Sequence, residues 1–164
     1  MDPRFLVFAA ALLAGTTVAL SLVDGGAQCK IKWMFGIDCS EVNEKLVNQI
    51  QAWQIRQSCA EEKSEKCSYE LVSGAPYLIK ATHTSHTSKK VNNFQFLLEQ
   101  STTCKVTGDS VTAITNLLPA ENSTNFCCMQ NLMDGSKLTE AEGYKMFSNK
   151  WICEGFDYAN CTMS

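Results

Sequence analysis

The sequence predicts an α+β fold, in which one N-terminal helix packs on a curved antiparallel sheet of four to five strands held together by disulfide bonds. Two hydrophobic periods support this class. Apolar residues recur with a helical period between residues 40 and 55, and then with a period of two in several segments between residues 67 and 113. In addition, nine cysteines follow an apolar N-terminal segment, which is typical of secreted, disulfide-bonded domains.

The composition indicates one ordinary globular domain. The chain has 164 residues, of which 45% are hydrophobic and 19% are charged, and this balance excludes a disordered chain. The formal net charge of −3 lacks the basic surplus of a nucleic-acid-binding protein. We therefore expect no nucleic-acid partner.

The first 27 residues have the organisation of a secretory signal peptide. Arg4 precedes an apolar run over residues 5–23, and the small residues Gly25, Gly26 and Ala27 follow it. Cleavage after residue 25 or after residue 27 fits this pattern. The alternative is an uncleaved membrane anchor, but small and polar residues interrupt the run and no basic cluster follows. We expect a secreted, extracellular domain over residues 28–164, without a transmembrane segment in the mature chain.

The cysteines predict a disulfide framework whose connectivity the spacing leaves open. Cys59 and Cys67 enclose a short charged loop, which a local disulfide would close at low entropic cost. No CxxC pair provides zinc-ligand spacing. The disulfide candidates are Cys29, Cys39, Cys59, Cys67, Cys104, Cys127, Cys128, Cys153 and Cys161.

An odd number of cysteines leaves one thiol without an intramolecular partner, and we place it at the adjacent pair Cys127 and Cys128. In an extended segment these side chains point to opposite faces. The outward-facing thiol would then couple to a second chain or to a small thiol. The sequence thus predicts either a disulfide-linked dimer or a capped cysteine.

The helix over residues 40–55 is predicted by Val42, Leu46, Ile50 and Trp53, which recur at helical spacing. We expect this stripe to pack on the sheet. Alternating residues predict strands over residues 67–71, 77–81 and 94–98. Two further strands, over 104–106 and 111–113, would form a hairpin around a Gly108-Asp109 turn.

Beyond this hairpin the pattern is less regular. Residues 119–125 are predicted as a polar loop, and a short strand is possible over residues 126–129. Thr139 and Glu142 have the spacing of a capping box, which predicts a further helix, although Gly143 would weaken it.

The order of one helix followed by antiparallel strands over residues 40–117 resembles the cystatin-like arrangement. The Gln-x-Val-x-Gly loop of inhibitory cystatins is absent, so the resemblance implies architecture and no inhibitory residues. The segments CSYELVS, IKATHT and CCMQNLMDG resemble small secreted cysteine-rich vertebrate proteins of unassigned function. This second resemblance implies secretion and no mechanism.

The sequence offers little for catalysis or metal binding. His83 and His86 are spaced for a shared metal on a helix, but their Ser- and Thr-rich surroundings favour a solvated loop without a third ligand. Gly108-Asp109-Ser110 matches the start of an esterase motif, yet no downstream histidine could activate Ser110. We therefore predict no catalytic residues, no metal site and no cofactor.

Asn122 and Asn160 begin N-glycosylation sequons. Together these features predict a secreted, disulfide-rich glycoprotein that acts as a non-enzymatic extracellular binding module, with an extracellular protein as its partner. One alternative is a carrier of a small hydrophobic ligand, such as a lipid, in a pocket between helix and sheet. A second, from the enzyme class, is a secreted hydrolase using Ser110 and His83.

Overall fold

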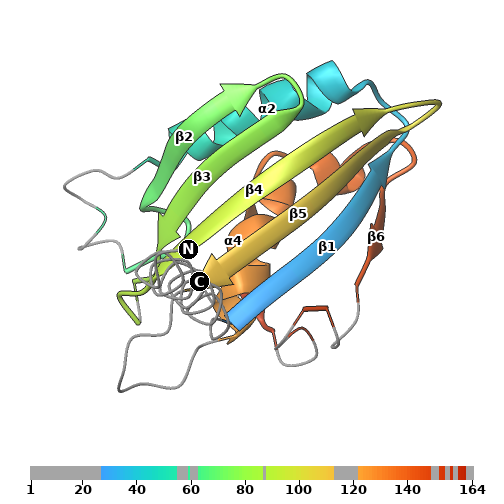
Figure 1. Ribbon diagram of the computed structural model, residues 1–164. Coiled ribbons are helices and arrows are strands. Elements are labelled where there is room, and N and C mark those ends of the chain that lie inside the picture. Colours follow the sequence, from blue (N-terminus) through green and yellow to red (C-terminus); the bar gives the residue numbers. More distant parts are fainter. Residues whose placement is uncertain are drawn as a thin grey trace, which may run out of the picture.

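The fold is α+β, with one antiparallel sheet covered by helices on a single face (Figure 1). The computed structural model describes residues 27–54, 59, 63–86, 88–112, 122–148, 152–153, 156 and 159–161. Within these residues the sheet has six strands in the order β2-β3-β4-β5-β1-β6. The predicted signal peptide lies outside the described residues except for Ala27.

The strands of the sheet are long in its centre and short at its β6 edge. They are β1 (Ala27–Phe35), β2 (Tyr69–Ala75), β3 (Leu78–Thr84), β4 (Val91–Gln100), β5 (Cys104–Thr112) and β6 (Lys145–Phe147). The helices are α2 (Cys39–Ala52) and α4 (Asn122–Gly135), with a short 3-10 turn, η1 (Leu138–Glu140). The fold class is as predicted, whereas the expected single helix and four to five strands are too few.

Helix α2 confirms the predicted amphipathic stripe. Cys39, Val42, Leu46 and Ile50 are buried, and Trp53 at the C-terminal end of the helix is half-buried. On the facing side of the sheet, Trp33, Phe35 and Phe96 are fully buried. Apolar side chains from both layers thus form one hydrophobic core.

The predicted hairpin at Gly108-Asp109 is wrong, because residues 104–112 form one continuous strand. Strand β5 pairs along its length with β4 on one side and with β1 on the other. Gly108 lies at the core face, where a Cβ atom would come within 2.6 Å of the Trp33 ring and 2.8 Å of the Met129 sulfur. Glycine is therefore required here by close packing and not by a turn.

Three other local predictions are also wrong. Residues 126–129, considered as a strand, belong to helix α4, and so do residues 122–125 of the predicted polar loop. The helix expected after Thr139 is absent: the chain passes through η1, turns at Gly143 with a φ of +72°, and forms β6. Strand β1, which the period analysis missed, lies between β5 and β6.

The described residues contain four disulfide bonds, three between distant segments and one local. Cys29–Cys153 and Cys39–Cys104 join β1 and the start of α2 to other segments, and Cys59–Cys67 closes the short charged loop, as expected. Cys127–Cys161 ties α4 to the C-terminal segment. Cys128 has a free thiol, so the odd cysteine belongs to the predicted pair.

Among the described residues, no helix is both long and apolar enough to span a bilayer.

Candidate functional site

The face of the sheet opposite the helices is the candidate binding surface, and we call it the open face. Alternation along the strands determines its residues. In β4, for example, Phe94, Phe96 and Leu98 are buried under the helices, whereas Gln95 and Leu97 point the other way. The exposed apolar residues on this face are Val72, Val91, Leu97, Val111 and Phe147.

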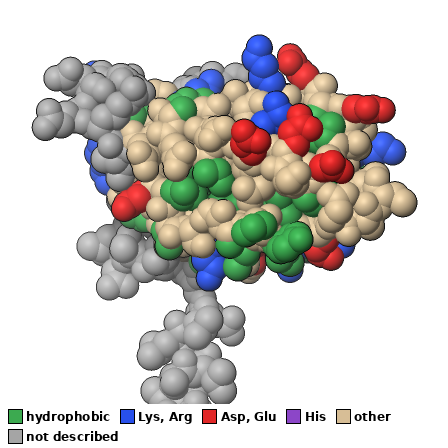
Figure 2. All heavy atoms as spheres, turned by 90° about the horizontal axis from the view of Figure 1, so that it is seen from above, with side chains coloured by type: hydrophobic (Ala, Val, Ile, Leu, Met, Phe, Trp, Pro, Cys, Tyr) green, Lys and Arg blue, Asp and Glu red, His purple; other side chains and the backbone are tan. Residues whose placement is uncertain are grey.

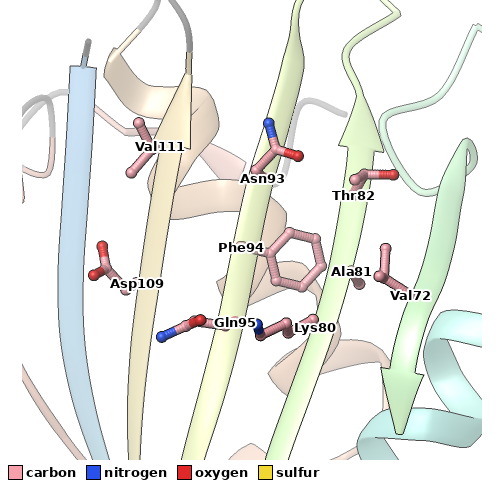
Figure 3. A pocket seen from close by; sticks show the side chains of 9 residues that line it. All are labelled: Val72, Lys80, Ala81, Thr82, Asn93, Phe94, Gln95, Asp109 and Val111. Carbon is pink, nitrogen blue, oxygen red and sulfur yellow. The ribbon is translucent and has the colours of Figure 1, made fainter. Parts of the chain in front are cut away.

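A shallow depression of about 330 Å³ lies on the open face across strands β2 to β5 (Figure 3). Its polar lining comes from neighbouring strands in register, where Gln95 is paired with both Lys80 and Asp109. The next row pairs Asn93 with Thr82 and Val111. Val72 completes the side-chain lining, and the core-facing residues Ala81 and Phe94 lie at its floor. The depression therefore combines an amine, a carboxylate, two amides and a hydroxyl with apolar side chains.

The open face carries more lysines than acidic residues, although the whole chain has a net charge of −3. Lys105 lies 3.8 Å from Glu99, and Asp109 accepts a hydrogen bond from Gln28 at 3.1 Å. Alternation places four further lysines on this face, and none of them pairs with a carboxylate of the described residues: Lys30, Lys32, Lys80 and Lys145. Glu70 of β2 is exposed opposite Thr82 and adds a third carboxylate to Glu99 and Asp109. With five lysines on the same face, the local charge excess is still positive.

Seen from above, several hydrophobic side chains gather in the lower half of the view, towards the open face (Figure 2). Most of the charged side chains visible in this view, lysines as well as acidic residues, lie in its upper half. Exposed apolar groups next to polar ones are characteristic of interaction surfaces.

A buried polar cluster lies at the opposite face of the sheet, between β4, β5 and α4. It consists of Asn92, Ser110, Thr112 and Asn125. The Oδ1 atom of Asn125 accepts hydrogen bonds from the Ser110 hydroxyl at 2.7 Å, from the Thr112 hydroxyl at 2.9 Å and from the Asn92 amide at 2.9 Å. Buried polar groups are costly unless paired, and in this cluster they are paired with one another.

The histidine positions differ from the prediction of a solvated loop. His83 is 2% exposed on β3, where burial lowers the pKa of its ring. Its Nδ1 lies 3.3 Å from Asn92 Oδ1, and its Nε2 lies 2.8 Å from the backbone oxygen of Glu65. His86 lies in the turn after β3 and is half-buried. Among the described residues, no group of three or more metal-ligating side chains exists.

The unpaired cysteine is buried, and this overturns the expectation of an outward-facing thiol. Cys127 and Cys128 lie on a helix, so their side chains diverge by about 100° and do not point to opposite faces of a strand. Cys128 is 1% exposed, and burial raises the pKa of its thiol to about 12. Its sulfur contacts the Asn125 carbonyl at 3.4 Å and the Ser110 hydroxyl at 3.5 Å. A disulfide to a second chain through this thiol would require the core to open.

The structure places Ser110 and the glycosylation candidates in different settings. Ser110 is fully buried, and its hydroxyl donates to Asn125 and not to His83. Asn122 is the first residue of α4, and Asn160 is exposed. Cys161, between Asn160 and the sequon threonine, is in a disulfide.

No protein-family model, curated protein or solved structure matches this chain. The geometry of the described residues is therefore the basis for inferring function.

Sequence reasoning missed the residues of the depression. The signal for Asn93 and Gln95 was present, because both alternate with the buried phenylalanines of β4. Asp109 was assigned to the predicted turn and Val111 to the second strand of the predicted hairpin, so neither residue was aligned with Gln95 or Asn93 of β4. A continuous β5 aligns them with the lysine and amide side chains of β3 and β4.

Proposed function

We propose that the protein is a secreted, non-enzymatic binding module that recognises an extracellular protein through the open face of its sheet. One observation carries this proposal. The open face presents exposed apolar residues together with four lysines that have no acidic partner among the described residues. Such a surface complements a partner with an apolar centre and acidic rim groups. The four disulfides support an extracellular location.

The two alternatives have less support. A carrier needs space between helix and sheet, yet that layer is packed so closely that a methyl group on Gly108 would overlap Trp33 and Met129. The depression lies instead on the other side of the sheet. A hydrolase using Ser110 would need this buried hydroxyl to donate to a base, and it donates to an amide oxygen.

Lysine-directed cross-linking tests the proposal, because lysines lie on both sides of the molecule. The full-length secreted protein is incubated with extracellular medium from its own source, cross-linked at lysine, and mapped by mass spectrometry. We expect partner cross-links from Lys30, Lys32 and Lys80 on the open face. Cross-links mainly from Lys45 of α2 and Lys137 beside η1 would contradict the proposal.

A matched pair of charge reversals adds a second measurement. Lys80→Glu lies in the depression, whereas Lys137→Glu is exposed on the helical side. We expect the first variant to reduce recovery of the cross-linked partner at least fivefold, because its new carboxylate would face the acidic groups of the partner. The second variant should leave recovery unchanged, because its carboxylate lies away from the open face. Equal recovery with both variants would refute recognition through the open face, and native mass spectrometry showing a bound lipid would favour the carrier.

A further inference from the structure

We propose that His83 and Glu65 form an acid-sensitive latch, which holds the loop of residues 63–68 against the end of strand β3. Glu65 lies in this loop, close to Cys67 of the Cys59–Cys67 disulfide. Its backbone oxygen is 2.8 Å from the His83 Nε2, and its carboxylate is 3.4 Å from the same nitrogen. The other carboxylate oxygen accepts a hydrogen bond from the Ser85 hydroxyl at 3.1 Å.

The hydrogen-bond network determines how many protons the latch can hold. The two Nδ2 hydrogens of Asn92 are shared among Thr112, Asn125 and Thr124, and this leaves the Oδ1 of Asn92 facing His83 Nδ1 at 3.3 Å. Both ring nitrogens of His83 therefore face oxygen acceptors. A neutral imidazole has only one N–H, and the shorter contact places it on Nε2, towards the loop.

A second proton would complete both hydrogen bonds but would bring a charge into the core. The ring of His83 stacks on Tyr69 of β2 at 4.6 Å between centroids. Burial raises the pKa values of the Tyr69 hydroxyl and of the Cys128 thiol of α4, so both groups stay neutral. Two charged residues also lie near the latch. Lys90, on the β3–β4 connection, accepts a hydrogen bond from the Ser85 amide through its backbone carbonyl. Glu65 is the carboxylate of the described residues that faces the ring.

The balance favours the neutral ring in the closed latch. Loss of hydration outweighs the help from Asn92 and Glu65, so the pKa of His83 lies below its ordinary value. A histidine with a lowered pKa in the closed state takes up its proton more readily when the latch is open and the ring is hydrated. Stability of the closed latch is therefore complete above the ordinary pKa, near 6.5, and is lost as the pH falls below it.

Backbone geometry around the latch supports a segment that is held in place by tertiary contacts. Lys63, Ser68 and Lys89 have φ values of +49°, +66° and +61°, in the left-handed region that non-glycine residues rarely adopt. Lys63 and Ser68 lie in the latched loop, and Lys89 lies in the connection that follows β3. Backbone strain of this kind persists only where neighbouring contacts impose it, so opening the latch would release it.

Proton NMR of the full-length secreted protein tests the titration directly, because the chain has two histidines. The variant His86→Gln assigns the two imidazole signals and serves as the control. We expect His83 to titrate with a midpoint below about 6.5, the ordinary histidine value. A midpoint at or above that value would overturn the proposal.

Amide hydrogen exchange tests the opening. The Thr84 amide donates to the Ser68 carbonyl at 3.1 Å and therefore reports the contact between the loop and β3. Between about pH 7.5 and about pH 5.5 we expect its protection factor to fall by up to about tenfold, the ratio set by a ring that is protonated only in the open state. The Val106 amide in the centre of the sheet should stay unchanged.

Two variants keep the proposal falsifiable. His83→Gln removes the titrating group, and it should abolish the pH dependence of Thr84 protection, whereas His86→Gln should retain it. If His83→Gln does not fold, the wild-type exchange profile still decides the matter. Thr84 protection that is the same at both pH values would refute the latch.

Discussion

Substitutions at Gly108 give the sharpest test of the packing between helix and sheet. A Cβ atom at this position would lie 2.6 Å from one Trp33 ring carbon, 3.0 Å from another and 2.8 Å from the Met129 sulfur. Contacts below 3.0 Å force the neighbouring groups to move. Because Trp33 and Met129 are fully buried, neither side chain has free space to enter. Overpacking of this kind costs about 1–3 kcal/mol.

The same substitution on the same sheet provides the control. At Gly74 in β2, an added Cβ would meet no atom closer than 3.5 Å, the contact being with Val47. We expect Gly74→Ala to be neutral or slightly stabilising, because alanine reduces the freedom of the unfolded chain. Chemical denaturation of both variants, with disulfides intact, gives the two free energies of unfolding.

Gly108→Asn separates the two interpretations of this position. In a Gly-Asp hairpin turn asparagine is well tolerated, because it readily adopts a positive φ. Under the Trp33 ring it adds both volume and polar atoms, so it should destabilise the protein by more than Gly108→Ala does. Should Gly108→Asn prove neutral, or should Gly108→Ala cost no more than Gly74→Ala, the close-packed continuous strand would be refuted.

Two further predictions concern the buried polar cluster and the Cys128 thiol that contacts it. Asn125→Ala removes the acceptor of three buried donors, and because some of these donors retain other partners we expect a loss of roughly 2–4 kcal/mol in urea unfolding. Asn48→Ala, at an exposed helical position, should change stability by less than about 0.5 kcal/mol, and equal effects of the two substitutions would contradict the cluster. The Cys128 thiol, with its pKa raised to about 12, should resist iodoacetamide in native buffer and react in denaturant, as followed by intact mass. Full labelling of the native protein, or a reducible dimer through Cys128, would show that the thiol is accessible.

The predictable elements are those in which one face is apolar and the other polar. Helix α2 and strands β3 and β4 bury one face only, so their hydrophobic period is clear in the sequence. In helix α4, by contrast, Asn125, Phe126, Cys128, Met129 and Asn131–Met133 are all buried. Burial on several sides removes the amphipathic period, and part of the buried surface is polar. A helix of this kind is difficult to detect from spacing alone.

Strand β5 shows how tertiary pairing overrides a local turn signal. Gly108-Asp109 between alternating residues is a typical hairpin sequence, and the competing interaction is not local. Pairing with β4 and β1 satisfies the backbone of residues 104–112 on both sides. A hairpin at this position would leave β4 and β1 without their common neighbour. The long-range ladder therefore determines the conformation.

The strand residues of the buried polar cluster, Asn92, Ser110 and Thr112, could nevertheless have been predicted from the alternation of the strands. Asn92 is in phase with Phe94 and Phe96 on β4, and the two hydroxyl residues are in phase with Val106 on β5. If the alternation of each strand is continued beyond its last apolar residue, these polar side chains are predicted to face the helices. Their residue types alone would have suggested exposure to solvent.

This end of the core is therefore held by hydrogen bonds, whereas the other end is held by apolar contacts. Such a network contributes only when every member is satisfied. We expect substitutions at this end to be more costly than their small side-chain volumes suggest. The outward-facing residues of the same strands contribute little to the core, so they can change with little loss of stability. Stability and the proposed recognition thus depend on alternate residues of the same strands.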